Sequence, residues 1–154
     1  MEESKEQLDQ PPPTNITVQG GANLNYNWLE KHCVAVLEFL HKEHSDVSVR
    51  VVDDLEMAAL HVKHSGIEGT TDVLTFDRGS DEKSLRVDIA VCVDVAIGEA
   101  TKRGHALQNE LLLYVVHGIL HCCGFDDHDE ESHEKMHAEE DRILSAIGVG
   151  CVWS

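Results

Sequence analysis

Residues 111–131, LLLYVVHGILHCCGFDDHDEE, decide how this chain folds and what it can bind. The first ten residues of the stretch are mostly apolar, and the pattern predicts a buried helix over residues 107–123. His117 and His121 are four residues apart, and residues at this spacing lie on the same face of a helix. Gly124 favours a helix end, because glycine readily adopts the left-handed conformation found just past a helix C-terminus. The stretch therefore predicts a helix, a glycine turn and a chain reversal.

Two histidines on an apolar helix are expected to be partly buried, and buried imidazoles need polar partners. A shared metal ion would satisfy both rings. After the turn, either His128 or Asp127 is placed to supply a third ligand. Three protein ligands leave a fourth position for water, which is typical of a catalytic zinc site. We therefore predict one divalent ion per chain, bound by His117, His121 and one of these two residues.

The residue after the first histidine limits the chemistry of this site. Zinc peptidases of the H-E-x-x-H type carry a glutamate there as general base. The equivalent residue here is Gly118, so a peptidase of that type would lack its base. Asp126 and Asp127 are further candidates, because a carboxylate often orients a metal-bound imidazole through a hydrogen bond.

The composition is that of one globular domain. The chain has 154 residues, 42% of them hydrophobic, which is enough to bury a core. No apolar run is long enough to cross a bilayer, and the N-terminal MEESKEQLDQPPP does not resemble a secretory signal. We expect a disordered acidic tail at residues 1–13, a single folded domain at residues 14–154 and a cytoplasmic location. The five cysteines have no framework spacing, so they are expected to be reduced thiols.

The formal net charge of −17 bears on possible partners. Nucleic-acid-binding proteins normally neutralise phosphates with Lys and Arg, so broad binding to duplexes, and DNA as a partner, are not expected. Residues 126–142 hold nine Asp or Glu, and we expect them on a solvated face of the last helix. His133 and His137 are four residues apart in this region, and we expect them on the same solvated face. The acidic excess does not exclude a phosphate substrate bridged by a metal.

The hydrophobic pattern predicts an α+β domain in the order βαβαββααα. Strands are expected at residues 16–20, 47–52, 71–76 and 85–93, the last two joined as a hairpin. Helices are expected at residues 28–43, 53–63, 94–103, 107–123 and 130–147, with Asp53 and Asp94 as N-caps. This order implies a small mixed sheet packed by about five helices, with the metal site on the helix and glycine turn.

The segments TDVLTF, VDIAV and HGILHCCGFDDH occupy residues 71–76, 87–91 and 117–128. In order and spacing they resemble the TDVLSF-like strand, the GDI-like strand and the HGxLHLxGYDH metal motif of the YbeY family of bacterial endoribonucleases. The resemblance covers roughly residues 14–148. It implies a metal-dependent endoribonuclease specific for single-stranded RNA. It further implies a role in ribosomal RNA maturation and ribosome quality control, with zinc as the ion and the small ribosomal subunit as a partner.

The resemblance also bears on the ligands. His117 and His121 match the first two histidines of the family motif. The family has five residues between its second and third histidines, whereas six precede His128 here, so an ungapped comparison places Asp127 at the third position. We expect His128 to be the third ligand, because an imidazole preserves the family's ligand set, and we keep Asp127 as the alternative. No catalytic residue beyond the metal ligands is assigned.

Two departures from the family pattern bear on catalysis. Ser65 stands where the family has an arginine, and neither Lys63 nor His64 nearby offers the bidentate phosphate grip of arginine. Val87 stands at the glycine of the GDI-like strand. The leading hypothesis is an endoribonuclease. The alternatives are a non-catalytic metalloprotein of ribosome assembly or RNA binding, and a metal hydrolase of another substrate.

Overall fold

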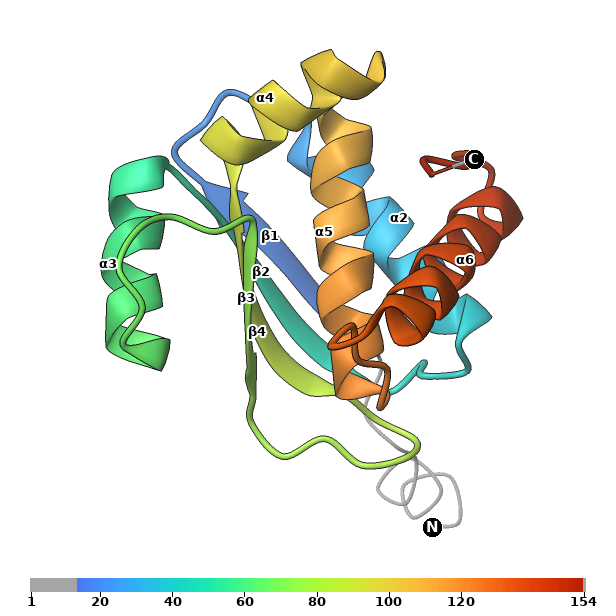
Figure 1. Cartoon of the computed structure of the whole chain (residues 1–154). Coiled ribbons are helices and arrows are strands. Elements are labelled where there is room, and N and C mark those ends of the chain that lie inside the picture. The colour runs from blue at the N-terminus through green and yellow to red at the C-terminus, as the bar shows by residue number, and fades with distance from the viewer. Residues whose placement is uncertain (1–13, 154) are drawn as a thin grey trace, which may run out of the picture.

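The computed structural model describes residues 14–153, and the predicted tail at residues 1–13 lies outside this range. Within it the chain forms four strands and five helices in the predicted order (Figure 1). The strands are β1 (Asn15–Gly20), β2 (Asp46–Val52), β3 (Val73–Asp77) and β4 (Arg86–Cys92). The helices are α2 (Tyr26–Phe39), α3 (Asp54–Ser65), α4 (Val93–Arg103), α5 (Leu107–Cys122) and α6 (Glu130–Ala146). None of these helices is long and apolar enough to span a membrane.

The strands form one mixed sheet in the order β1-β2-β4-β3. β1, β2 and β4 run parallel, while β3 pairs with β4 antiparallel at the edge. The predicted α+β class and the predicted hairpin are therefore confirmed. Val87, which replaces the family glycine, is fully buried in β4 and pairs with Val47 and Asp77. The strand thus forms with a side chain at this position.

Helices cover both faces of the sheet (Figure 1). The alternating valines Val47, Val49 and Val51 of β2 point into a large core shared with α2, α5 and α6. On the opposite face, a smaller core around Met57 of α3 includes Leu74 of β3. The period of two along each strand assigns neighbouring side chains to opposite faces, and this pattern gives a three-layer arrangement.

α5 lies at the centre of the larger layer, where it contacts α2, α4, α6, β3 and β4. Its apolar residues are buried on all sides, as expected for a helix that is hydrophobic around its whole circumference. Gly118 permits its close approach to the sheet, because a Cβ there would lie 2.8 Å from Thr75 Oγ1. This contact sets the rotation of α5 about its axis, and hence the direction in which His117 and His121 point.

The two predicted helix caps have different outcomes. Asp53 caps α3 as predicted, because its side chain accepts a hydrogen bond from Glu56 N. Asp94 does not cap α4, since that helix already begins at Val93. Its carboxylate instead accepts a hydrogen bond from Asp54 N at 2.8 Å. Asp94 therefore stabilises the start of α3 across the sheet edge, a contact that local sequence could not indicate.

Candidate metal centre

His117 and His121 of α5 converge with Asp127, which lies in the loop before α6. The Nε2 atoms of the two histidines are 3.0 Å apart. The Asp127 carboxylate lies 3.5 Å from His117 Nε2 and 3.9 Å from His121 Nε2. Two nitrogen ligands of a tetrahedral zinc ion, each about 2.0–2.1 Å from the metal, would be about 3.3 Å apart. One atom from each residue can therefore reach a single ion.

The other nitrogen of each imidazole is engaged by an acceptor. His117 Nδ1 lies 3.1 Å from Glu140 Oε2, and His121 Nδ1 lies 3.0 Å from the carbonyl oxygen of Phe125. An acceptor at Nδ1 favours the neutral tautomer with its proton on Nδ1 and a lone pair on Nε2. Both lone pairs then face the same point. Hydrogen bonds of this kind orient metal-bound histidines in proteins, and the arrangement fits a cation between the two rings.

Glu140 holds the His117 imidazole in place, and this role was not predicted from the sequence. Its side chain is 1% exposed on α6, and Oε1 accepts a hydrogen bond from Trp153 Nε1 at 3.2 Å. Asp126, our sequence candidate for a supporting carboxylate, is exposed and accepts a hydrogen bond from the backbone of His128. The sequence did contain a sign that Glu140 is buried. It lies on the same face of α6 as the buried apolar residues Met136, Ile143 and Leu144. A charged residue in a core stripe is expected to have a buried partner.

The geometry favours Asp127 over our preferred His128 as the third ligand. Asp127 joins the two imidazoles, whereas His128 is exposed and lies outside this group of ligand atoms in residues 14–153. The turn explains the difference. Gly124 adopts φ 98°, and His121 binds the Phe125 carbonyl, so the returning chain presents Asp127 to the helix. Asp129, two residues later, is already the N-cap of α6.

The electrostatic potential at the site suits a cation. Burial opposes protonation of His117, but the hydrogen bond and charge of Glu140, with the charges of Asp72 and Asp127, outweigh it and raise the pKa of His117. The same carboxylates would stabilise any positive charge held at this point. The histidine and carboxylate donors are those that zinc and other divalent transition metals use in proteins.

A cavity of about 450 Å³ opens from the metal group. Its walls come from α4, α5, α6, the loop before β3 and the C-terminal segment. His133 and His137 both line this cavity. His133 is exposed, as predicted for a solvated face, whereas His137 is half-buried and stacks on Trp153. Ser65, at the position of the family arginine, ends α3 on the other face of the sheet and does not line the cavity.

The fold is a mixed sheet covered by a central helix, α5, which carries two imidazoles. A carboxylate from the turn after α5 joins them. This combination defines a candidate metallohydrolase. A family model described as Endoribonuclease YbeY matches residues 16–148. The chain belongs to the YbeY endoribonuclease family.

Individual relatives agree with the family model. The chain is 35% identical to an endoribonuclease YbeY from Corynebacterium jeikeium over 66% of its length and 62% of the relative. It is 33% identical to one from Gloeobacter violaceus (70% and 60%) and 35% identical to one from Desulfitobacterium hafniense (70% and 74%). The chain therefore spans about three fifths of the first two relatives. A solution structure of a Thermotoga maritima protein matches with a TM-score of 0.57 and 25% identity, over 86% of this chain and 90% of that one.

Proposed function

We propose that this chain is a metal-dependent endoribonuclease that hydrolyses phosphodiester bonds in single-stranded RNA. The observation that carries the proposal is the convergence of His117, His121 and Asp127 on one point, in a chain of the YbeY family. Zinc is the proposed ion, because two imidazoles and a carboxylate are common zinc ligands. A divalent ion bound there would polarise a phosphoryl oxygen and lower the pKa of a bound water.

The protein's own contribution is orientation. Glu140 and the Phe125 carbonyl hold the two imidazoles with Nε2 towards the ion position. Asp127 supplies a negative carboxylate within 4 Å of both Nε2 atoms. Gly118 packs against the sheet, so the glutamate of an H-E-x-x-H peptidase has no counterpart at this position. The cavity beside the ligands gives a substrate access to this group.

We further propose that the substrate is ribosomal RNA. The chain would then act with the small ribosomal subunit in the cytoplasm, in ribosomal RNA maturation and ribosome quality control. Support comes from the resemblance of its three motif segments to the family and from the match to the family model. The net charge of −17 disfavours a broad basic binding surface, so contact with RNA would be confined to the site.

A cleavage assay on single-stranded RNA tests the activity. Wild type should cut the RNA, and His117→Ala and His121→Ala should each lose at least about 100-fold, the usual scale for a lost catalytic contribution. His41→Ala is the matched control, because its side chain is 90% exposed and outside the site. Equal activity in all four proteins would mean a contaminating nuclease.

The non-catalytic alternative has one specific observation in its favour, namely Ser65 in place of an arginine. The same proteins distinguish it. If zinc raises the melting temperature of wild type but not of His117→Ala, and no RNA is cut, the chain is a metalloprotein of ribosome assembly or RNA binding.

A further inference from the structure

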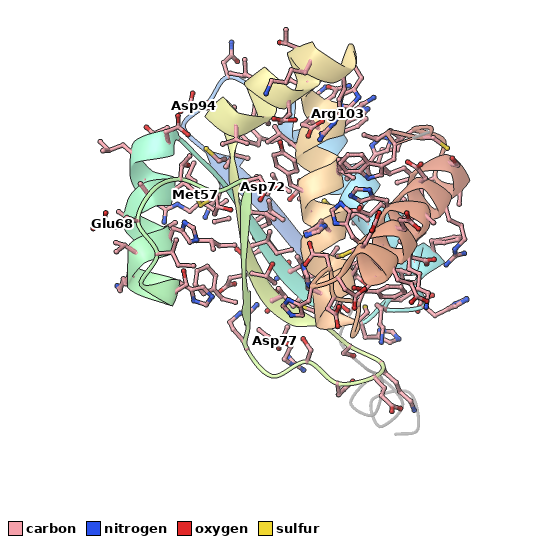
Figure 2. All side chains as sticks on the ribbon, viewed as in Figure 1. Met57, Glu68, Asp72, Asp77, Asp94 and Arg103 are labelled. Carbon is pink, nitrogen blue, oxygen red and sulfur yellow. The ribbon has the colours of Figure 1, made fainter. Side chains whose placement is uncertain are left out.

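The cavity extends beyond the metal group along α5. Tyr114 lies one helical turn before His117 and lines the same cavity. At about 1.5 Å per residue, it is about 10 Å along the axis from His121. Arg103, the last residue of α4, and Trp153 complete this end of the cavity. Figure 2 shows Arg103 near the end of α5 that is remote from the glycine turn, and Asp72 beside the middle of the helix.

The Tyr114 hydroxyl is buried without a hydrogen bond of ordinary geometry. The residue is 4% exposed, and its oxygen is the one buried side-chain polar atom in residues 14–153 without a hydrogen bond. Burial and the nearby Glu110 carboxylate raise the pKa of Tyr114, so the hydroxyl keeps its proton. The Glu110 carboxylate accepts hydrogen bonds from Arg103 and His105, and these two donors compete with the Tyr114 hydroxyl for it. A buried donor of this kind is costly unless something else accepts from it.

The charges at this end disfavour an anion. Arg103 is the one Lys or Arg that lines the cavity in the described part of the chain. Its guanidinium is paired with Glu99 and with the fully buried Glu110. Asp72 adds a further carboxylate to the wall. Phosphate would therefore be repelled here, while a neutral group with hydrogen-bonding atoms would not.

Two ring side chains, Trp153 and His137, line the cavity near the Tyr114 hydroxyl and form an aromatic wall. The Trp153 ring is stacked on the His137 imidazole, with centroids 3.8 Å apart and an angle of 9° between the planes. The Arg103 guanidinium also lies over the Trp153 ring, 4.3 Å from its centroid, and Trp153 is still 36% exposed. The carboxylate of Asp141 accepts hydrogen bonds from the backbone N–H groups of Val152 and Trp153, and Trp153 Nε1 binds Glu140. The wall is thus held in place before any ligand arrives.

We propose that this end of the cavity is a nucleobase subsite, in which one base of the RNA packs against the exposed part of Trp153 and accepts a hydrogen bond from Tyr114. The inference rests on the proposed function and names the part of the substrate that this end would take. A base is neutral, partly apolar and rich in acceptors, which matches the charges at this end, the exposed part of Trp153 and the buried donor. The phosphate would lie towards His117 and Asp127. The cavity volume of about 450 Å³ lies within the range of about 300–1,000 Å³ typical of small-ligand pockets.

Trp153 can report binding directly. The chain has two tryptophans, and Trp28 does not line the cavity, so Trp28→Phe leaves Trp153 as the sole indole fluorophore. The four nucleoside 5′-monophosphates are added separately, with ribose 5-phosphate as the control that lacks a base. At least one nucleotide should quench the fluorescence saturably, and ribose 5-phosphate should not. Calorimetry on the unmodified protein repeats the comparison in case Trp28→Phe does not fold.

The two tyrosines provide a matched pair of variants. Tyr114→Phe removes a hydroxyl without a hydrogen bond of ordinary geometry, so it should leave the melting temperature unchanged or raise it, and weaken nucleotide binding about threefold to tenfold. Tyr26→Phe removes a hydroxyl that donates to the Ala22 carbonyl at 2.6 Å outside the cavity. It should lower the melting temperature and leave nucleotide binding unchanged.

Equal binding of ribose 5-phosphate and the nucleotides, or no binding by either, would overturn the subsite. So would Tyr114→Phe binding every nucleotide as tightly as the parent protein. These outcomes are separate from the proposed function, because nucleotide binding requires no cleavage. Base-dependent binding by a protein that does not cut RNA would refute the nuclease and keep the subsite. Cleavage of RNA without base-dependent nucleotide binding would support the nuclease and refute the subsite.

Discussion

Glu140→Gln isolates the role of the buried carboxylate behind the candidate metal ligand His117. In the wild type one carboxylate accepts hydrogen bonds from two donors, His117 Nδ1 and Trp153 Nε1. A glutamine of the same shape has one acceptor oxygen and one amide nitrogen that only donates. One of the two donors must therefore face the amide NH₂ group. Either His117 changes its tautomer or rotamer, or Trp153 loses its hydrogen bond.

The expected size of the effect follows from the burial of this contact. Hydrogen bonds to charged groups contribute about 1.5–3 kcal/mol, and solvent screens this one little because Glu140 is 1% exposed. Each 1.4 kcal/mol corresponds to about a factor of ten in an equilibrium constant. Zinc affinity should therefore fall about 10- to 100-fold, which agrees with the usual effect of losing a partner of a metal-bound histidine.

Competition for zinc with a chromogenic chelator measures this affinity directly. Glu139→Gln is the matched control, because it removes the same charge from the neighbouring residue, which pairs with Arg142 rather than with a histidine. It should change zinc affinity less than about threefold, the scale of a surface charge pair. If folded Glu140→Gln protein binds zinc as tightly as the control, Glu140 does not position His117 for a metal, and the reasoning is refuted.

Three further outcomes are expected. Asp127→Asn should weaken zinc binding in the same competition assay while His128→Asn should not; the opposite order would restore the imidazole as third ligand. Gly118→Glu should lower the free energy of unfolding in urea by about 3 kcal/mol or more, because it places an unpaired charge against the sheet; a neutral effect would mean that α5 is not packed as described. Iodoacetamide at pH 8 should label the exposed Cys151 first by mass spectrometry and leave Cys33 unlabelled, since burial raises the pKa of Cys33 to about 12 and keeps it protonated; early labelling of Cys33 would contradict its burial.

The sequence predicted the parts of this structure that depend on local periodicity. The spacing of His117 and His121 on an apolar helix, the glycine turn and the order of elements were all visible in short windows. The proposed third ligand was harder to predict, because its position depends on the direction in which the chain leaves Gly124. Spacing alone left both Asp127 and His128 open, and preserving an imidazole favoured the residue that the loop turns outward.

The contacts behind the ligands depend on tertiary structure. Glu140 is 23 residues from His117 in the chain, and only the packing of α6 against α5 brings the two together. The same packing turns His137 towards the cavity and Trp153 back onto α6. The acidic composition of the last helix favoured a solvated face, but this average concealed two buried carboxylates, Glu140 and Asp141.

The most direct test of the central claim is anomalous diffraction at the zinc edge, from crystals of untagged protein loaded with zinc. One peak should lie between the two imidazoles, with His117 Nε2, His121 Nε2 and an Asp127 oxygen each about 2.0–2.2 Å from the ion. A structure without an ion at that point, or with the ion held by His128 while Asp127 turns away, would contradict the site described above.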